Sequence, residues 1–139
     1  MIDLFDTSAL ILAARDPGAG AVLADSVAND ELALSEPILL EYLTGARNLA
    51  EYDRFDRGLR AGRLVRTTPD DWDRALFVHR QLAASGPGHQ GSVRLVDLIV
   101  AAAAERHALP VVHYDEDYDR IAAVTGQPTR WIVPRGSTR

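Results

Sequence analysis

The sequence has no cysteine and no lysine, and all 15 of its basic residues are arginines. The lack of cysteine excludes thiolate metal sites, cysteine nucleophiles and disulfide bonds, and it agrees with a reducing compartment. The lack of lysine excludes every site that needs a lysine ammonium group. The chain also has neither a phosphate-binding glycine-rich loop nor a dinucleotide-binding fingerprint.

Long hydrophobic runs are absent as well. The longest apolar stretch, residues 98–104, is far too short to span a bilayer. The N-terminus carries no basic segment followed by an apolar run, so no signal peptide is predicted. We therefore expect a cytoplasmic protein without a membrane partner.

The composition is that of an ordinary globular chain, with 47% hydrophobic and 25% charged residues in 139 positions. This length suits one domain whose core needs no disulfide bond. We expect a single domain over residues 1–139, of which 134–139 form a loose tail. The net charge of −5 argues weakly against nucleic-acid binding, although local patches matter more than the total.

The spacing of apolar residues predicts strands and helices in alternation. Strands are expected at 2–5, 31–34, 64–66, 110–113 and 130–133, and helices at 9–14, 19–28, 36–47, 49–61, 69–84, 93–107 and 115–125. The glycine- and proline-rich stretch 85–92 is expected to be a loop. Strands separated by helices run parallel, with right-handed crossovers. The predicted fold class is α/β, a three-layer sandwich, in which functional groups gather at the carboxyl ends of strands.

Acidic residues follow two of these predicted strands. Asp6 comes directly after strand 2–5, and Asp115 and Asp117 come soon after strand 110–113. Each has a structural alternative, because aspartate is a preferred helix N-cap and acids in a first helical turn are stabilised by the helix dipole. Three aspartates on alternate residues, with Asp119 as the third, exceed what a cap needs.

Two further acids lie on predicted helices. Asp97 falls within residues 94–104, a helix that is apolar nearly all round and is therefore expected to be buried. A buried carboxylate without a partner is costly, and an ion pair with Arg94, three residues earlier, is the structural alternative. Glu41 interrupts the apolar stretch 38–43, and its alternative is a boundary glutamate that reaches solvent.

Together these acids point to a metal site. Carboxylates that are brought together repel one another unless a cation neutralises them. Oxygen ligands without cysteine suit Mg²⁺ or Mn²⁺. Such ions lower the pKa of a bound water and neutralise charge on a phosphoryl group, which predicts hydrolysis of a phosphodiester.

The ordered set of these residues resembles the PIN-domain ribonucleases, and specifically the VapC-type toxins of bacterial toxin–antitoxin pairs. The likeness spans essentially the whole chain, and each piece of it is weak alone. The matching pieces, in the order of the family, are Asp6-Thr7-Ser8, Glu41, Arg94-x-x-Asp97 followed by Ile99 and an alanine run, and His113-Tyr114-Asp115-x-Asp117-Tyr118.

The resemblance implies a five-stranded parallel sheet of order 3-2-1-4-5 and a Mg²⁺- or Mn²⁺-dependent endoribonuclease. The catalytic residues that it implies are Asp6, Glu41, Asp97, Asp115 and Asp117. Asp6, Asp97 and Asp115 are the implied metal ligands, with Ser8 and Arg94 in supporting positions. The resemblance also implies a homodimer, a cognate VapB-type antitoxin, and an RNA substrate such as tRNA, rRNA or mRNA.

Other interpretations stay beside this one. A receiver or phosphotransfer domain also gathers aspartates at strand ends, but those families commonly use a lysine, which this chain lacks. A PIN-like module that binds RNA or protein without catalysis would be favoured by loss of an acid, and none of the four main acids is missing. A metal-dependent DNA nuclease stays open, because no motif here reads the 2′-hydroxyl of RNA.

Two predicted helices carry patterns outside the acidic set. In helix 69–84, six side chains are expected to face the core, namely Trp72, Ala75, Leu76, Val78, His79 and Leu82. In and after helix 49–61, arginine recurs every third residue at Arg54, Arg57, Arg60 and Arg63. This stripe has two interpretations. It contacts either RNA phosphates or an acidic segment of the antitoxin, or it is a solvated face whose charge is offset by neighbouring acids.

Overall fold

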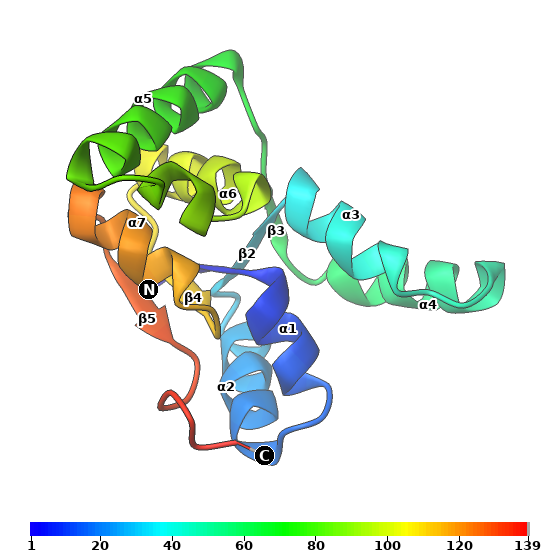
Figure 1. Ribbon diagram of the computed structural model, residues 1–139. Coiled ribbons are helices and arrows are strands. Elements are labelled where there is room, and N and C mark those ends of the chain that lie inside the picture. The colour runs from blue at the N-terminus through cyan, green and yellow to red at the C-terminus, as the bar shows by residue number, and fades with distance from the viewer. Residues whose placement is uncertain (139) are drawn as a thin grey trace.

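The computed structural model describes residues 1–138 and contains a sheet of five parallel strands (Figure 1). The strand order is β3-β2-β1-β4-β5, as predicted. The strands are β1 (Asp3–Phe5), β2 (Leu32–Ser35), β3 (Arg63–Val65), β4 (Val111–His113) and β5 (Thr129–Trp131). All four strand pairs are parallel, which confirms the α/β class.

Helices flank this sheet on both sides. They are α1 (Thr7–Ala13), α2 (Pro17–Ala28), α3 (Glu36–Thr44), α4 (Leu49–Leu59), α5 (Pro69–Ser85), α6 (Leu95–Arg106) and α7 (Asp117–Thr125), with a short 3₁₀ helix η1 (His89–Ser92). Helices α5, α6 and α7 pack together, and α1 packs against α2 (Figure 1). The pair formed by α3 and α4 projects away from the strands (Figure 1).

The core is centred on the two middle strands. Leu4 and Phe5 of β1 and Val111 and Val112 of β4 have no exposed surface, because helices cover both faces of the sheet. Residues 97–104 of α6 are all buried, as the apolar character of that helix predicts. The buried position of α6 brings Asp97 to the centre of the molecule.

Helix ends differ from the predicted bounds where local capping decides them. The helix predicted at 36–47 ends at Thr44, and Asn48 then caps α4 by accepting a hydrogen bond from Glu51 N at 2.9 Å. The helix predicted at 93–107 begins only at Leu95, because Val93 and Arg94 are extended. The helix predicted at 115–125 begins at Asp117, which leaves Asp115 in the connection from β4.

Two predictions around α5 were wrong. Trp72 and Leu76 are exposed, because α5 buries only the stripe that Ala75, Val78 and Leu82 form at helical spacing. The stretch 85–92 is not irregular throughout, since residues 89–92 form η1.

The C-terminal residues 134–138 form neither a helix nor a strand, but they contact the preceding part of the chain. The Tyr114 hydroxyl accepts hydrogen bonds from Gly136 N at 3.0 Å and from Thr138 Oγ1 at 3.1 Å. The Arg135 guanidinium lies 2.6 Å from Glu116 and stacks on the Trp131 ring. Residue 139 lies outside the described part of the chain. Among residues 1–138, no helix combines the length and the apolar character needed to cross a bilayer.

Candidate active site

The predicted strand-end acids meet at the centre of the sheet. Strand β1 lies between β2 and β4, so the chain changes direction across the sheet at the β1–β4 pair. Asp6 follows β1, and its backbone N–H donates to Val112 O at 2.8 Å. Asp115 follows the neighbouring β4. Ligand sites of open α/β sheets lie at such switch points, outside the carboxyl ends of the strands.

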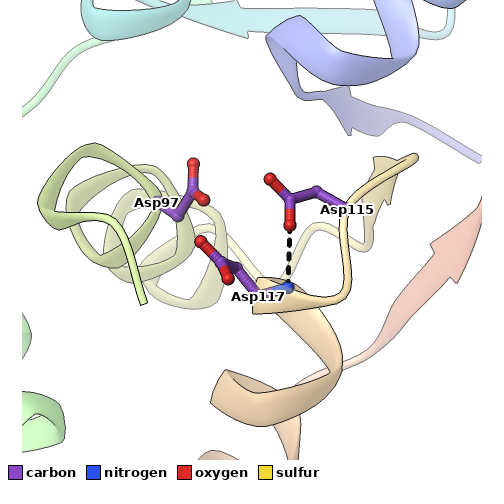
Figure 2. A group of neighbouring side chains, drawn as sticks. All are labelled: Asp97, Asp115 and Asp117. Carbon is purple, nitrogen blue, oxygen red and sulfur yellow. Dashed lines mark hydrogen bonds between the residues drawn. The ribbon is translucent and has the colours of Figure 1, made fainter. Parts of the chain in front are cut away.

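Three carboxylates come together at this point. Asp97, Asp115 and Asp117 each offer an oxygen, and these oxygens all lie within 4.8 Å of one another. Asp97 reaches the group from α6, whereas Asp115 and Asp117 come from the β4–α7 connection and the start of α7 (Figure 2). The grouping thus joins two segments that are far apart in the sequence.

Asp97 is the most constrained of the three. It is 1% exposed, and its Oδ2 has no hydrogen-bond partner among residues 1–138. Burial, followed by the effects of the neighbouring Asp117, Asp6 and Asp115 carboxylates, raises the pKa of Asp97 to about 9. A buried, unpaired carboxylate oxygen beside two further carboxylates fits a bound divalent cation, which would neutralise all three.

Backbone groups hold the other two carboxylates. Asp117 N donates to Asp115 Oδ1 at 2.9 Å, which is the dashed line in Figure 2. Asp117 Oδ2 accepts from Arg94 N at 3.0 Å, and Asp117 Oδ1 accepts from Arg120 Nη1 at 3.1 Å. The start of α6 and the start of α7 are therefore joined through the Asp117 carboxylate.

Asp6 lies beside this group and is held by three hydroxyl or amide groups. As the N-cap of α1, it accepts at Oδ2 from Ser8 N at 3.0 Å and from Ser8 Oγ at 2.6 Å. Its Oδ1 accepts from the Tyr118 hydroxyl at 2.6 Å, and that hydroxyl lies 3.3 Å from Asp97 Oδ1. Burial and the two carboxylates raise the pKa of Tyr118 well above its ordinary value, so the phenol keeps its proton. Asp6 is thus both a helix cap and a neighbour of Asp97.

Glu41 lies at the edge of the same region. Its Oε1 accepts from Thr7 Oγ1 at 2.9 Å, and its Oε2 lies 2.6 Å from the Arg94 guanidinium. The ion pair between Arg94 and Asp97 that the sequence allowed is not formed among residues 1–138, because Arg94 turns to Glu41 instead. Glu41 is therefore not merely a solvent-reaching boundary residue.

His113 contacts the site through ring packing and one hydrogen bond. It is buried, and its ring lies between those of Tyr118 and Trp131, each at a centroid distance of 5.0 Å. Its Nδ1 accepts from Asp115 N at 3.2 Å. Burial lowers the pKa of His113 against the opposing effect of nearby aspartates, which keeps this nitrogen free to accept. Asp119 points elsewhere and accepts from Trp131 Nε1 at 3.3 Å.

Three side chains that contact the acids were given no role at the site from the sequence, namely Thr7, Tyr118 and Arg120, although Thr7 and Tyr118 stand within the matching motifs. Tyr118 had a readable signal, because it is followed three residues later by Ile121 on the inward face of α7. Arg120 lies three residues after Asp117, the spacing at which helical side chains meet. Nothing in the sequence pairs Thr7 with Glu41, since 34 residues separate them.

The arginine stripe is mostly paired. Arg54 lies 3.6 Å from Glu51 within α4, and Arg60, the C-cap of α4, lies 3.4 Å from Asp56. Arg63 is in β3, not on the helix, and pairs with Asp30 at 2.8 Å. These contacts favour the interpretation of a solvated face offset by acids.

Known proteins resemble this chain in sequence. The model of the PIN domain family matches residues 4–124. The chain is 41% identical over 137 residues to Ribonuclease VapC18 of Mycobacterium tuberculosis (strain ATCC 25618 / H37Rv), which covers 99% of both chains. It is 47% identical over 98 residues to Ribonuclease VapC51 of the same strain, over 70% of this chain and 69% of that protein.

Solved structures share the fold at lower identity. A toxin–antitoxin complex from Klebsiella pneumoniae includes a chain with a TM-score of 0.72 and 20% identity, which covers 94% of this chain and 98% of that one. VapBC-1 from nontypeable Haemophilus influenzae has a TM-score of 0.75 at 18% identity, over 95% of this chain and 98% of that chain.

Proposed function

Because this chain belongs to the PIN-domain family and, within it, to the VapC ribonucleases of toxin–antitoxin systems, we propose that it is a Mg²⁺- or Mn²⁺-dependent endoribonuclease. The observation that carries this proposal is the meeting of Asp97, Asp115 and Asp117, with a buried and unpaired oxygen on Asp97. In this proposal Asp6, Asp97 and Asp115 hold the ion.

The proposed reaction is hydrolysis of an RNA phosphodiester. A bound divalent ion neutralises charge on the phosphate and lowers the pKa of a bound water. The water oxygen forms a bond to phosphorus, the bond to the leaving oxygen breaks, and a proton passes from the water to the leaving oxygen. Ser8 orients Asp6 for this task, and Asp117 joins the start of α7 to Arg94.

Three carboxylate variants test this proposal. Asp6→Asn and Asp97→Asn remove a proposed ligand charge without changing side-chain size, and each is expected to lower the cleavage rate at least 100-fold. Asp119→Asn is the matched control, because Asp119 binds Trp131 and not the acidic group. Purified protein without antitoxin is assayed on structured RNA with Mg²⁺, with Mn²⁺ and with a chelator.

The outcomes separate the alternatives. Cleavage that requires the metal and is lost in both variants supports the proposal. A folded protein that cleaves neither RNA nor DNA supports the inactive binding module instead. Cleavage of a DNA strand of the same sequence in preference to RNA supports a DNA nuclease. Mapping of cut RNAs after expression in a bacterial host would distinguish tRNA, rRNA and mRNA targets.

We also propose a VapB-type antitoxin as partner, since the solved neighbours include toxin–antitoxin complexes. An apolar hollow of about 260 Å³ lies between α1, α2, α3 and α4 and suits an apolar segment of that partner. Its lining includes Leu10, Leu23, Val27, Tyr42, Phe55 and Leu59. Val27→Glu is expected to abolish co-purification with a co-expressed VapB-type antitoxin.

A homodimer is proposed on a different face. Trp72, Leu76 and Leu95 are more than half exposed and line one apolar hollow, and contiguous exposed apolar patches mark interaction surfaces. Leu76→Glu is expected to convert a dimer to a monomer in sedimentation analysis while antitoxin binding persists. Val27→Glu is the reciprocal control, because it should leave the dimer intact.

A further inference from the structure

We infer that the Tyr118 hydroxyl is a positioning group that holds the Asp6 and Asp97 carboxylates in register for the divalent cation. This inference rests on the proposed function. Its basis is one contact set: the hydroxyl donates to Asp6 Oδ1 at 2.6 Å and lies 3.3 Å from Asp97 Oδ1. No other side chain among residues 1–138 forms hydrogen bonds with both of these acids.

The position of Asp6 requires such a group. The compact carboxylate cluster contains Asp97, Asp115 and Asp117 but not Asp6. Asp6 comes from the start of α1, whereas Asp97 is on α6, and 91 residues of chain separate them. The Tyr118 hydroxyl bridges the two segments, so it sets how closely Asp6 approaches the cluster.

The Tyr118 hydroxyl is not needed to fill space in the core. Tyr118 is 0% exposed and its ring packs on His113 at 5.0 Å. A phenylalanine would fill the same space without placing a polar oxygen in the core, where an unpaired polar group is costly. The phenol has one proton, so it donates to one carboxylate at a time, and the shorter bond goes to Asp6.

The ion would be shared by the two carboxylates that the phenol touches. Outer groups that orient metal ligands typically contribute about 10-fold to 100-fold in metal affinity. Loss of the hydroxyl frees the Oδ1 side of Asp6, while Ser8 still holds Oδ2. The expected defect is therefore weaker ion binding in a folded protein.

Mn²⁺ titration of RNA-free protein by calorimetry tests this inference. Tyr118→Phe is expected to raise the Kd for Mn²⁺ about 10-fold, and excess Mn²⁺ should restore part of the cleavage rate. Tyr52→Phe is the matched control, because it removes a phenol oxygen on α4 that has no hydrogen bond among residues 1–138. In the Asp6→Asn background, Tyr118→Phe should have little further effect on Kd, because the two residues act as a unit.

A purely structural role would lower the melting temperature in chelator and leave the Kd for Mn²⁺ unchanged, which would overturn the inference. If the wild type binds no Mn²⁺, the proposed function fails and this inference falls with it. If the wild type binds and Tyr118→Phe binds equally well, only this inference fails.

A second measurement needs no variant of Tyr118. With ¹³Cζ-labelled tyrosine, the Tyr118 resonance is assigned by elimination through Tyr42→Phe, Tyr52→Phe and Tyr114→Phe. Mg²⁺ is expected to shift this resonance and leave that of Tyr52 unchanged. An unshifted Tyr118 resonance at saturating Mg²⁺ would contradict the inference.

Discussion

The Arg94 guanidinium lies 2.6 Å from Glu41 Oε2, which joins the start of α6 to the middle of α3 across 53 residues of sequence. The same arginine donates its backbone N–H to Asp117 at 3.0 Å. The pair therefore connects Glu41 with the acidic cluster without burying Glu41 among the other carboxylates.

Glu41→Gln tests whether this connection serves catalysis. The amide oxygen still accepts from Thr7, but the charge that pairs with Arg94 is lost. We expect the cleavage rate to fall at least 10-fold, while the free energy of unfolding changes by less than about 1 kcal/mol, because the Arg94 side chain is largely solvated. Single-turnover rates and urea unfolding measure the two effects. An unchanged rate would remove Glu41 from the mechanism.

Asp97 predicts how the stability of the metal-free protein depends on pH. Its pKa of about 9 in the folded state exceeds the unfolded value, so folding takes up a proton between about pH 4 and pH 9. The stability that this proton contributes is fully present below about pH 4 and is lost as the pH rises toward 9. Urea unfolding in the presence of a chelator, at a series of pH values, should show the free energy of unfolding decrease over this interval.

Asp97→Asn is the reference for that measurement, because its amide does not titrate. The metal-free variant is expected to lose less stability than the wild type over the same pH interval. Saturating Mg²⁺ should reverse the trend in the wild type, since the ion binds the charged carboxylate. Parallel stability profiles for the two proteins in chelator would show that Asp97 titrates normally.

Asp71 predicts an effect on stability away from the site. Burial by itself would raise its pKa, but hydrogen bonds from Arg106 and the Thr68 backbone outweigh burial and lower it. Asp71→Asn should therefore lower the free energy of unfolding at neutral pH by about 2 kcal/mol, because a helix cap and a charge-assisted hydrogen bond are weakened.

The stability difference between the wild type and Asp71→Asn depends on pH, because only the wild type carries the Asp71 carboxylate, whose pKa is lowered by folding. The stabilisation by Asp71 is present above its unfolded pKa and is lost as the pH falls through the lower folded value. The difference between wild type and Asp71→Asn should shrink in acid. Urea unfolding at neutral and acidic pH checks this, and a difference that is constant with pH would argue against the ion pair.

We expect Arg135, in the C-terminal segment, to contribute to the cleavage rate although it is not one of the site residues. Arg135 pairs with Glu116 and stacks on Trp131, and Glu116 is adjacent to Asp115 and Asp117 in the chain. Arg135→Ala is expected to lower the cleavage rate a few-fold by loosening this connection. Arg80→Ala, an exposed arginine of α5, is the matched control. Equal cleavage rates for the two variants would show that the C-terminal segment does not contribute to catalysis.

Local patterns anticipated much of the fold for a physical reason. Apolar spacing distinguishes strand from helix, and alternation of the two leads to a parallel sheet with right-handed crossovers. Helix ends were less predictable, because they depend on caps such as Asn48 and on extended residues such as Arg94. The exposed positions Trp72 and Leu76 were misjudged because periodicity gives an apolar face but not its width.

The sequence by itself determined the types and order of the elements, the absence of thiol and lysine chemistry, and the candidate acids at strand ends. Only the tertiary structure decided which side chains meet: Asp97 with Asp115 and Asp117, Arg94 with Glu41, and Tyr118 with Asp6 across 112 residues. The reason is that strand and helix propensities act over a few neighbouring residues, whereas these contacts depend on how whole helices pack against the sheet.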